Sequence, residues 1–277
     1  MVDWLGLGDP PAVGAMNFNS IVENLPLRRD HAVFDFGCGI GRTSVFLAEF
    51  LNEGGCVVGS DIVPNWIQFC REHFAHPFPN ATFYCVKAGH PVYDDIIAAT
   101  ATDTTPVIDE KQFFPKYSEV FDVVVAFSVF THFDPKMAAY YLKSLKDITK
   151  LSGHLFLTWF LDHPSNPVGS RLGPEENFRD RDGKLQFAIF SLAAVAELAS
   201  GAGLLVERIS YGTWRNWPPE ASLKGQHDQD IVVLRPDLPI EFDANRYLSI
   251  HKDVADAGMN PVHHYLTYGR KEGRRLR

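Results

Sequence analysis

Apolar and polar residues alternate along most of the chain in an order that is typical of strands followed by helices. Short apolar runs bounded by turn residues predict buried strands, and apolar positions three or four apart predict the helices between them. Strands are expected at residues 31–36, 56–60, 81–86, 121–127, 154–161, 204–211 and 230–234. Helices are expected at residues 18–25, 43–51, 64–74, 135–151 and 191–201. This order predicts an α/β fold with a doubly wound, mostly parallel seven-stranded sheet.

A few turn and cap residues indicate where these elements end. Gly54 and Gly55 are expected to close the second helix, and Gly153 is expected to end the long fourth one. Ser191 is expected to cap the N-terminus of the last helix. The last two strands are joined without a helix, so one of them should run antiparallel to the rest of the sheet.

Two long polar stretches, residues 89–120 and 162–187, interrupt the alternation. The first is expected to be irregular, with one helical turn. Connections of this length in a compact domain usually have a function or are partly mobile. Prolines 236 and 239 then mark a linker. The expected parts of the chain are an N-terminal segment (1–30), a main domain (31–236) and a small helical unit (240–277).

The composition is that of a soluble globular protein, since 45% of the 277 residues are hydrophobic and 22% are charged. A net charge of −8 argues against a nucleic-acid-binding protein, which would normally carry a basic face. The basic run at residues 270–277 is expected to be a solvated tail. The chain has no signal-peptide pattern and no apolar run near the roughly 20 residues of a membrane span. A cytoplasmic protein without a membrane span is therefore expected, and nothing indicates its oligomeric state.

Four cysteines occur without a CxxC pair or another spacing typical of a zinc site or a disulfide framework. They are expected to be reduced and mostly buried. Aspartates and histidines are scattered along the chain rather than clustered. No bound metal is expected.

A glycine-rich turn is the main chemical signal in the sequence. The segment VFDFGCGIGR, residues 33–42, ends the first strand and begins a helix, with Gly37, Gly39 and Gly41 at alternate positions. Glycines at these positions allow a sharp turn and a close approach of a ligand to the backbone. Amide groups at the start of the helix favour electronegative ligand atoms. Asp61 ends the next strand, where an acidic side chain can accept hydrogen bonds from both hydroxyls of a ribose.

The turn distinguishes between two classes of nucleotide-binding protein. A nicotinamide-dependent dehydrogenase uses GxGxxG, which would require glycine or alanine at the position of Arg42. The pattern present is GxGxG. A dehydrogenase is therefore disfavoured, whereas a tight turn without any ligand remains as a structural alternative.

These residues resemble the class I S-adenosylmethionine-dependent methyltransferase family, and the resemblance extends from about residue 17 to residue 235. The resemblance implies a Rossmann-like fold and S-adenosyl-L-methionine as cofactor. It implies that Asp35 and the backbone of the turn, Gly37–Gly41 with Cys38 included, hold the methionine part, and that Arg42 belongs to the same site. It likewise implies that Asp61 holds the ribose and that Ile62 lies against the adenine.

One element of the family pattern is missing. Many relatives carry an acidic residue just after the third strand, which binds the adenine amine, whereas this chain has Val-Lys-Ala-Gly at residues 86–89. Backbone groups near Ala88 are expected to take its place.

The segment FDVVVAFSVFTHF, residues 121–133, resembles the fourth strand of the family, whose end faces the sulfonium of the cofactor. The resemblance implies that Phe127 and Ser128 line the methionine region, chiefly through their backbone. His132 follows in the loop. Because the unperturbed pKa of histidine lies near neutrality, His132 could accept a proton from an attacking hydroxyl. It could equally contact the substrate or cofactor, or brace the following helix.

Aromatic residues flank the strand ends that should open toward a substrate. Trp159, Tyr211 and Trp214 are the candidate substrate contacts, with Phe160 and Trp217 nearby. Their rings could stack on a sugar or another ring, or they could fill the core beneath a loop. Three arginines of the second polar stretch could meet an anionic substrate, although a solvated loop is the simpler interpretation: Arg171, Arg179 and Arg181.

The last residues of the chain contain the pieces DVADAG, NPVHHYL and GRKEGR. They resemble a short module that is attached to bacterial glycosyltransferases and other enzymes of surface polysaccharides. A small helical core is expected there from six residues: Tyr247, Leu248, Val254, Tyr265, Leu266 and Tyr268. His263 and His264 are neighbours in sequence and would point in different directions on a helix, so packing is favoured over metal binding.

The sequence thus predicts a methyltransferase that uses S-adenosyl-L-methionine to O-methylate a sugar-containing or other small-molecule acceptor. By association, the C-terminal module favours a glycan or a glycan precursor and a role in bacterial polysaccharide modification. Substrate is expected to enter between the two polar stretches. The alternative is a non-catalytic partner protein that keeps the fold and docks through the C-terminal unit.

Overall fold

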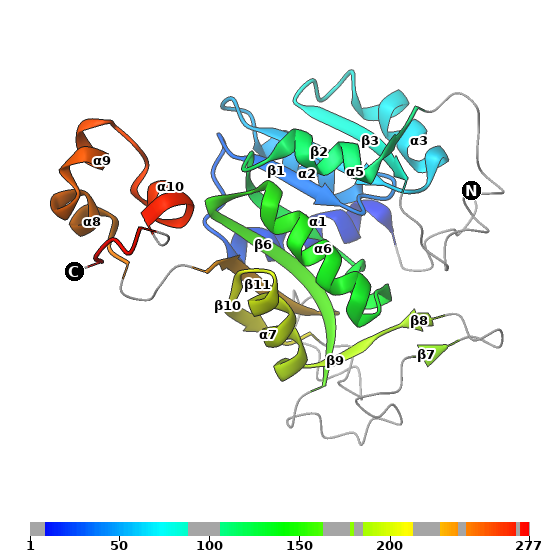
Figure 1. The fold of residues 1–277 in the computed structure, drawn as a ribbon. Coiled ribbons are helices and arrows are strands. Elements are labelled where there is room, and N and C mark those ends of the chain that lie inside the picture. Colours follow the sequence, from blue (N-terminus) through cyan, green and yellow to red (C-terminus); the bar gives the residue numbers. More distant parts are fainter. Residues whose placement is uncertain are drawn as a thin grey trace.

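The computed structural model of the protein describes residues 9–87, 106–162, 178–179, 185–212, 228–237, 242–269 and 272–276. A twisted sheet of nine strands forms its centre (Figure 1). Eight strands follow the order β10-β11-β6-β5-β1-β2-β3-β4, and β9 pairs with β6. Their bounds are β1 Ala32–Phe36, β2 Cys56–Asp61, β3 Ala81–Lys87, β4 Val107–Asp109, β5 Phe121–Ala126, β6 Thr149–Asp162, β9 Ile189–Ser191, β10 Leu204–Ser210 and β11 Asp230–Pro236. A separate two-stranded ribbon joins β7 Phe178–Arg179 and β8 Leu185–Phe187.

Helices cover both faces of the sheet, as the doubly wound fold predicts. The first face is covered by α1 Pro10–Asn24, α2 Arg42–Phe50 and α3 Pro64–Phe74. The second is covered by α5 Glu110–Phe113, the 3₁₀ turn Phe114–Tyr117, α6 Pro135–Ile148 and α7 Leu192–Gly201. Side chains alternate between the two cores, so that Val33 packs against the first set of helices and Phe34 against the second.

The strand order places a crevice at the centre of the sheet. Strand β1 pairs in parallel with β2 on one side and with β5 on the other, and successive strands are added outward in opposite directions from there. In open α/β sheets, ligands bind at the carboxyl ends of the strands at such a switch point. A ligand-binding site is therefore expected at the carboxyl ends of β1 and β5.

The fold class is confirmed, and the number of strands differs from the expected seven. The seven expected strands are all present, and two three-residue strands, β4 and β9, add to them. Strand β4 lies within the first polar stretch, where an irregular segment with one helical turn was expected. The expected antiparallel strand is β11, which runs against both β6 and β10.

Several expected element ends are wrong, each for a local reason. Helix α1 begins at Pro10 rather than near residue 18, because proline is well suited to the first turn of a helix. Helix α2 ends at Phe50, before the two glycines, because the side-chain amide of Asn80 caps it by donating to the carbonyls of Ala48 and Leu51 at 2.8 and 2.7 Å.

Gly153 lies inside β6 and does not end the preceding helix. Helix α6 ends at Ile148, and Thr149 begins the strand at once. A Cβ atom added at Gly153 would lie 2.8 Å from the carbonyl oxygen of Asp122, so the glycine allows β6 to approach β5 closely. By contrast, Ser191 caps α7 as expected, since its hydroxyl accepts a hydrogen bond from the amide of Ala194 at 3.1 Å.

The C-terminal helices form a separate group in Figure 1. They are α8 Ala244–Ile250, α9 Lys252–Asp256, α10 Pro261–His264 and the π-helical turn Tyr265–Gly269. Tyr247, Val254 and Tyr265 are buried together, whereas Tyr268 is 46% exposed and the side chain of Leu266 lies outside the described residues. His264 is buried, and its Nδ1 lies 2.9 Å from the hydroxyl of Tyr247, which gives it a packing role. The side chain of His263 lies outside the described residues. No described helix is both long enough and apolar enough to cross a membrane.

Candidate functional site

The glycine turn lies between β1 and α2, at the switch point of the sheet. Gly37, Gly39 and Gly41 have φ values of +74°, +56° and +76°. All three lie in the left-handed region, which costs glycine little and costs residues with a Cβ about 1–2 kcal/mol. The alternate glycines of the sequence are thus required by the backbone of this turn.

The three glycines differ in what surrounds them. A Cβ atom added at Gly37 would overlap the side chain of Val129, and one added at Gly41 would lie 3.1 Å from the sulfur of Cys70. A Cβ added at Gly39 would meet no atom within 4 Å. The turn is therefore packed against the protein at its two ends and open at its centre, where a ligand can reach the backbone.

Asp61 connects the end of β2 to the centre of this turn. Its Oδ2 accepts a hydrogen bond from the amide of Gly39 at 2.8 Å, and its Oδ1 accepts one from the amide of Val63 at 3.0 Å. The side chain is 8% exposed, and burial raises the pKa of its carboxyl to about 6, against the effect of the two amide donors. The residue that was expected to bind a ribose thus also fixes the glycine turn. Its neighbour Ile62 is half-buried and accepts a weak hydrogen bond from Cys85 through its carbonyl oxygen.

Asp35, in β1, precedes the turn by two residues. It is buried, and the hydroxyl of Ser44 on α2 donates to its Oδ2 at 2.5 Å. Burial raises the pKa of Asp35 to about 6, the Ser44 hydrogen bond lowers it, and the neighbouring Asp61 raises it further. Arg42, at the start of α2, is half-buried, and burial lowers its pKa. The structure therefore places Asp35 where it holds α2 onto β1.

The raised pKa of Asp35 predicts how stability depends on pH. A carboxyl whose folded-state pKa exceeds its unfolded value binds more protons in the folded protein, so its contribution to stability is present at low pH and is lost as the pH rises through about 6. An Asp35→Asn variant keeps an oxygen that accepts from Ser44 and removes this titration. Relative to the wild type, we expect the variant to be more stable at pH 7.5, by on the order of 2 kcal/mol, and to show no advantage near pH 4.

Urea denaturation at the two pH values measures this difference. Ser44→Ala is the control, because it removes the hydrogen bond to Asp35 and leaves the carboxyl ionisable. An Asp35→Asn variant whose stability relative to the wild type does not change with pH would contradict the assignment.

Two thiols contact the backbone of the glycine turn. Cys38 and Cys70 both point their sulfurs at the carbonyl oxygen of Gly39, at 3.7 and 3.5 Å. Burial, together with the hydrogen bond to Cys70, raises the pKa of Cys38. The four cysteines have free thiols, and Cys38, Cys70 and Cys85 are buried. These residues pack the turn and are poorly suited to nucleophilic chemistry.

The end of β5 adds a second unusual backbone segment next to the glycine turn. Ser128 has a φ of +57° although it is not a glycine. Its amide donates to the hydroxyl of Thr158 at 2.8 Å, and its hydroxyl donates to the side-chain oxygen of Gln229 at 3.1 Å. Phe127, just before it, is 7% exposed and packs its ring on Phe156, so its side chain belongs to the core.

His132 lies next to an aromatic ring that the sequence did not indicate. It ends the 3₁₀ turn Phe130–His132, and its ring centroid lies 5.4 Å from that of Phe187. The ring of Phe160 meets the same phenylalanine edge-on at 5.8 Å. Phe187 is 41% exposed, and His132 and Phe160 are half-buried. These three residues form an aromatic wall near the carboxyl ends of β5 and β6. The alternation of Leu185, Phe187 and Ile189 could have indicated a strand carrying this ring.

The expectation for Trp159 needs correction. Its side chain is completely buried, and it packs on Phe130 at 4.7 Å and edge-on against Phe190 at 5.0 Å. Alternate residues of a strand face opposite sides, and Trp159 faces the core covered by α6 and α7. Its indole nitrogen and the hydroxyl of Thr131 are buried without a hydrogen-bond partner among the described residues. Tyr211, in contrast, follows β10 at the same edge of the sheet and is 42% exposed.

Some expected site residues lie outside the described residues: Ala88, Trp214, Trp217, Arg171, Arg181 and the side chain of Arg179. The same holds for most of the two polar stretches between which substrate entry was expected. In the part of the chain that the structure describes, no three His, Cys, Asp or Glu side chains are grouped as a metal site would require.

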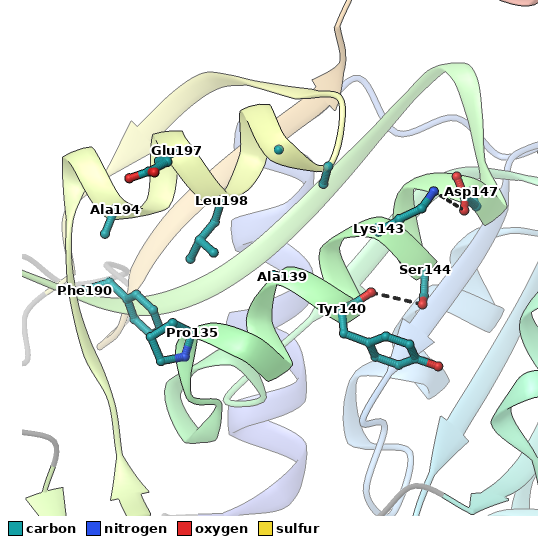
Figure 2. Close-up of a pocket in the computed structure, with 12 residues that line it drawn as sticks. Pro135, Ala139, Tyr140, Lys143, Ser144, Asp147, Phe190, Ala194, Glu197 and Leu198 are labelled. Carbon is teal, nitrogen blue, oxygen red and sulfur yellow. Dashed lines mark hydrogen bonds and ion pairs between the residues drawn. The ribbon is translucent and has the colours of Figure 1, made fainter.

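A large open groove, of about 820 Å³, lies elsewhere on the molecule. Figure 2 shows it between α6 and α7, with Phe190, Leu198 and Tyr140 among its lining residues. None of the residues that line it belongs to the glycine turn, to Asp61 or to the aromatic wall. The groove is therefore distinct from the candidate site.

Comparison with known proteins agrees with this geometry. Residues 27–160, which include the glycine turn, Asp61 and the end of β5, match the family model described as a methyltransferase domain. These residues are thus similar to a methyltransferase domain. Such a domain implies S-adenosylmethionine as its cofactor.

Solved structures show the same fold at low sequence identity. The PH0226 protein of Pyrococcus horikoshii OT3 is 17% identical, with a TM-score of 0.53 over 82% of this chain and 90% of that protein. The mitomycin 7-O-methyltransferase MmcR is 14% identical, with a TM-score of 0.51, and the match covers 82% of this chain but only 55% of MmcR. The magnesium protoporphyrin IX methyltransferase of Synechocystis PCC 6803, solved with bound S-adenosylhomocysteine, is 16% identical, with a TM-score of 0.50 over 82% of this chain and 85% of that one. The chain therefore shares the Rossmann-like fold of these structures.

Proposed function

We propose that this protein transfers a methyl group from S-adenosylmethionine to a hydroxyl group of a small molecule, with sugar-containing acceptors as the first candidates. One observation carries the proposal. The glycine turn of the methyltransferase domain is open only at Gly39, and the amide of Gly39 is bonded to the carboxylate of Asp61. A backbone that a ligand can approach and an acidic side chain are thus side by side at the switch point of the sheet.

The residues present fit the methyl donor. Each oxygen of Asp61 accepts one backbone hydrogen bond, and an ionised carboxylate has about four acceptor positions, so both oxygens can accept a ribose hydroxyl as well. The open side of Gly39 leaves room for a ligand against the backbone. Asp61 and the turn would hold the ribose and the methionine part, and the backbone at Ser128 would lie along the latter.

The chemistry requires little from the protein beyond alignment. When bound, the donor would supply an already activated methyl group, whose bond to sulfur breaks as a bond to the acceptor oxygen forms. The chain has to hold the acceptor at the right distance and angle, exclude water and take up the hydroxyl proton. The aromatic wall of His132, Phe160 and Phe187 would contact the acceptor, because partly exposed rings near the ends of β5 and β6 can stack on the flat face of a sugar or another ring.

The glycan preference rests on the resemblance of the C-terminal helices to modules of polysaccharide enzymes. A cytoplasmic location stays a prediction from composition.

Calorimetric titration with S-adenosylhomocysteine tests the donor site. Incubation with S-adenosylmethionine, nucleotide sugars and glycans, read by mass spectrometry, tests the acceptor. We expect binding in the micromolar range and one added methyl group on a sugar-containing product. Folded protein that does not bind at millimolar ligand would overturn the proposal, and binding without methylation of any acceptor would favour the non-catalytic alternative.

His132 is the proposed proton acceptor of the reaction. With the acceptor identified in that screen, His132→Ala is expected to lower kcat about a hundredfold, which is within the range for loss of a general base, while the Kd for S-adenosylhomocysteine stays within twofold. Phe187→Ala is the control from the same wall, and it should raise KM and leave kcat nearly unchanged. Unchanged kcat in His132→Ala would remove this residue from the chemistry.

A further inference from the structure

We propose that Thr158 and Gln229 are positioning residues of the methyl-donor site, which act by holding Ser128 in its left-handed backbone conformation. The inference rests on the proposed function, because it concerns the same site. It adds two residues that lie outside the glycine turn. Thr158 lies within β6, and Gln229 lies just before β11.

Ser128 needs a partner to keep its conformation. Among the described residues other than glycine, only Ser128 and Glu119 have a positive φ, and Glu119 lies in the turn that precedes β5. A side chain in this region costs about 1–2 kcal/mol, so it persists where the surrounding structure compensates. Such residues are concentrated at functional sites, and Ser128 directly follows Phe127 at the switch-point end of β5.

Three hydrogen bonds provide the compensation. The amide of Ser128 donates to the Thr158 hydroxyl at 2.8 Å. The Thr158 hydroxyl donates to Oε1 of Gln229 at 2.7 Å, and the Ser128 hydroxyl donates to the same oxygen at 3.1 Å. Thr158 is completely buried. These groups form a closed network, which we call the Ser128 clamp.

The clamp is anchored by the residue after Gln229. Asp230 is 1% exposed and accepts hydrogen bonds from the amides of Leu161 at 2.7 Å and Gly212 at 2.9 Å. It therefore ties the beginning of β11 to the end of β6 and to the segment that follows β10. With this end of β11 fixed, the side chain of Gln229 extends across β6 to reach Ser128 at the end of β5.

The clamp acts on the glycine turn through Val129. The left-handed turn at Ser128 directs the chain so that the side chain of Val129 packs against Gly37, where an added Cβ would overlap it. If Ser128 relaxed to a negative φ, Val129 would move, and the glycine turn would lose its contact with Val129 at Gly37. The clamp thus couples the ends of β6 and β11 to the backbone that receives the donor.

Binding and stability measured in parallel test this proposal. Thr158→Val removes the hydroxyl at nearly constant shape, and Gln229→Leu removes the shared acceptor. Both are expected to weaken S-adenosylhomocysteine binding about tenfold in calorimetry. Gln229→Glu keeps an acceptor oxygen and should bind within about threefold of the wild type. Thermal unfolding without ligand records the stability of each variant.

The double variant Ser128→Gly/Thr158→Val separates positioning from a purely structural role. Glycine adopts a positive φ without help, so the double variant is expected to regain most of the affinity lost in Thr158→Val while its unfolding temperature stays low. Wild-type affinity in Thr158→Val and Gln229→Leu, or a double variant as weak as Thr158→Val, would overturn the clamp while the proposed function stands. A wild type that does not bind would overturn both.

Discussion

A Gly39→Ala variant is expected to lose about a hundredfold in affinity for S-adenosylhomocysteine and to remain folded. The added methyl group would enter the open side of the turn, where no protein atom lies within 4 Å, so the space that it occupies is the space proposed for the ligand. The positive φ of +56° adds a cost of about 1–2 kcal/mol to the folded backbone. Calorimetry gives the affinity, and urea denaturation gives the stability.

Gly37→Ala is the matched control, since it makes the same substitution in the same turn. There the new methyl group would overlap Val129, so the free energy of unfolding should fall by about 3 kcal/mol or more. The two variants should therefore separate loss of binding from loss of stability. Binding within twofold of the wild type in Gly39→Ala would mean that the donor does not approach this side of the turn.

Asp61→Asn should have a comparably large effect on binding. The amide group retains one acceptor oxygen and replaces the other with a donor, which would face either the amide of Gly39 or that of Val63. It would also lose the charge that strengthens hydrogen bonds from the two ribose hydroxyls. Loss of two charge-assisted hydrogen bonds, each about 1.5–3 kcal/mol, predicts weakening of S-adenosylhomocysteine binding by at least about a hundredfold.

The pH dependence of binding provides a second test of Asp61. Since burial raises the pKa of this carboxyl to about 6, the wild-type affinity should fall as the pH falls through that value, because the protonated form has lost an acceptor. Asp61→Asn should bind weakly at pH 5 and pH 8 alike. Asp35→Asn is the control, and it should keep a pH dependence, because the carboxyl of Asp61 remains ionisable in this variant. A wild type whose affinity is the same at pH 5 and pH 8 would contradict the role of Asp61.

The sequence was most informative where backbone geometry dictates the residue type. Alternate glycines predicted a sharp turn, and the three positive φ values explain why glycine occupies these positions. Asp61, at the end of the second strand, was predicted to belong to the same cofactor site, and its carboxylate accepts a hydrogen bond from the amide of Gly39. Both follow from local spacing and from the parallel pairing of adjacent strands.

Other features depend on contacts between distant segments, which no local pattern encodes. Thr158 and Gln229 are 71 residues apart and meet Ser128 only because β11 inserts beside β6. Trp159 was a candidate either for substrate contact or for filling the core, and the face of β6 on which it lies is decided by the register with β5 and β11. Asn80, which caps α2, is likewise supplied by the turn before β3.

The position of β11 has a consequence for how the chain is made. Strand β11 follows β10 in the sequence and yet lies between β10 and β6. During translation, β6 therefore keeps an open edge on that side until residues 230–236 have left the ribosome, and an open edge is a template for aggregation. Gln229 and Asp230 arrive with the strand that closes it. Pairing of β11 with β6 thus covers the open edge and completes the Ser128 clamp in one late step. A nascent chain would therefore acquire its proposed donor site only when this edge of β6 is no longer a template for aggregation.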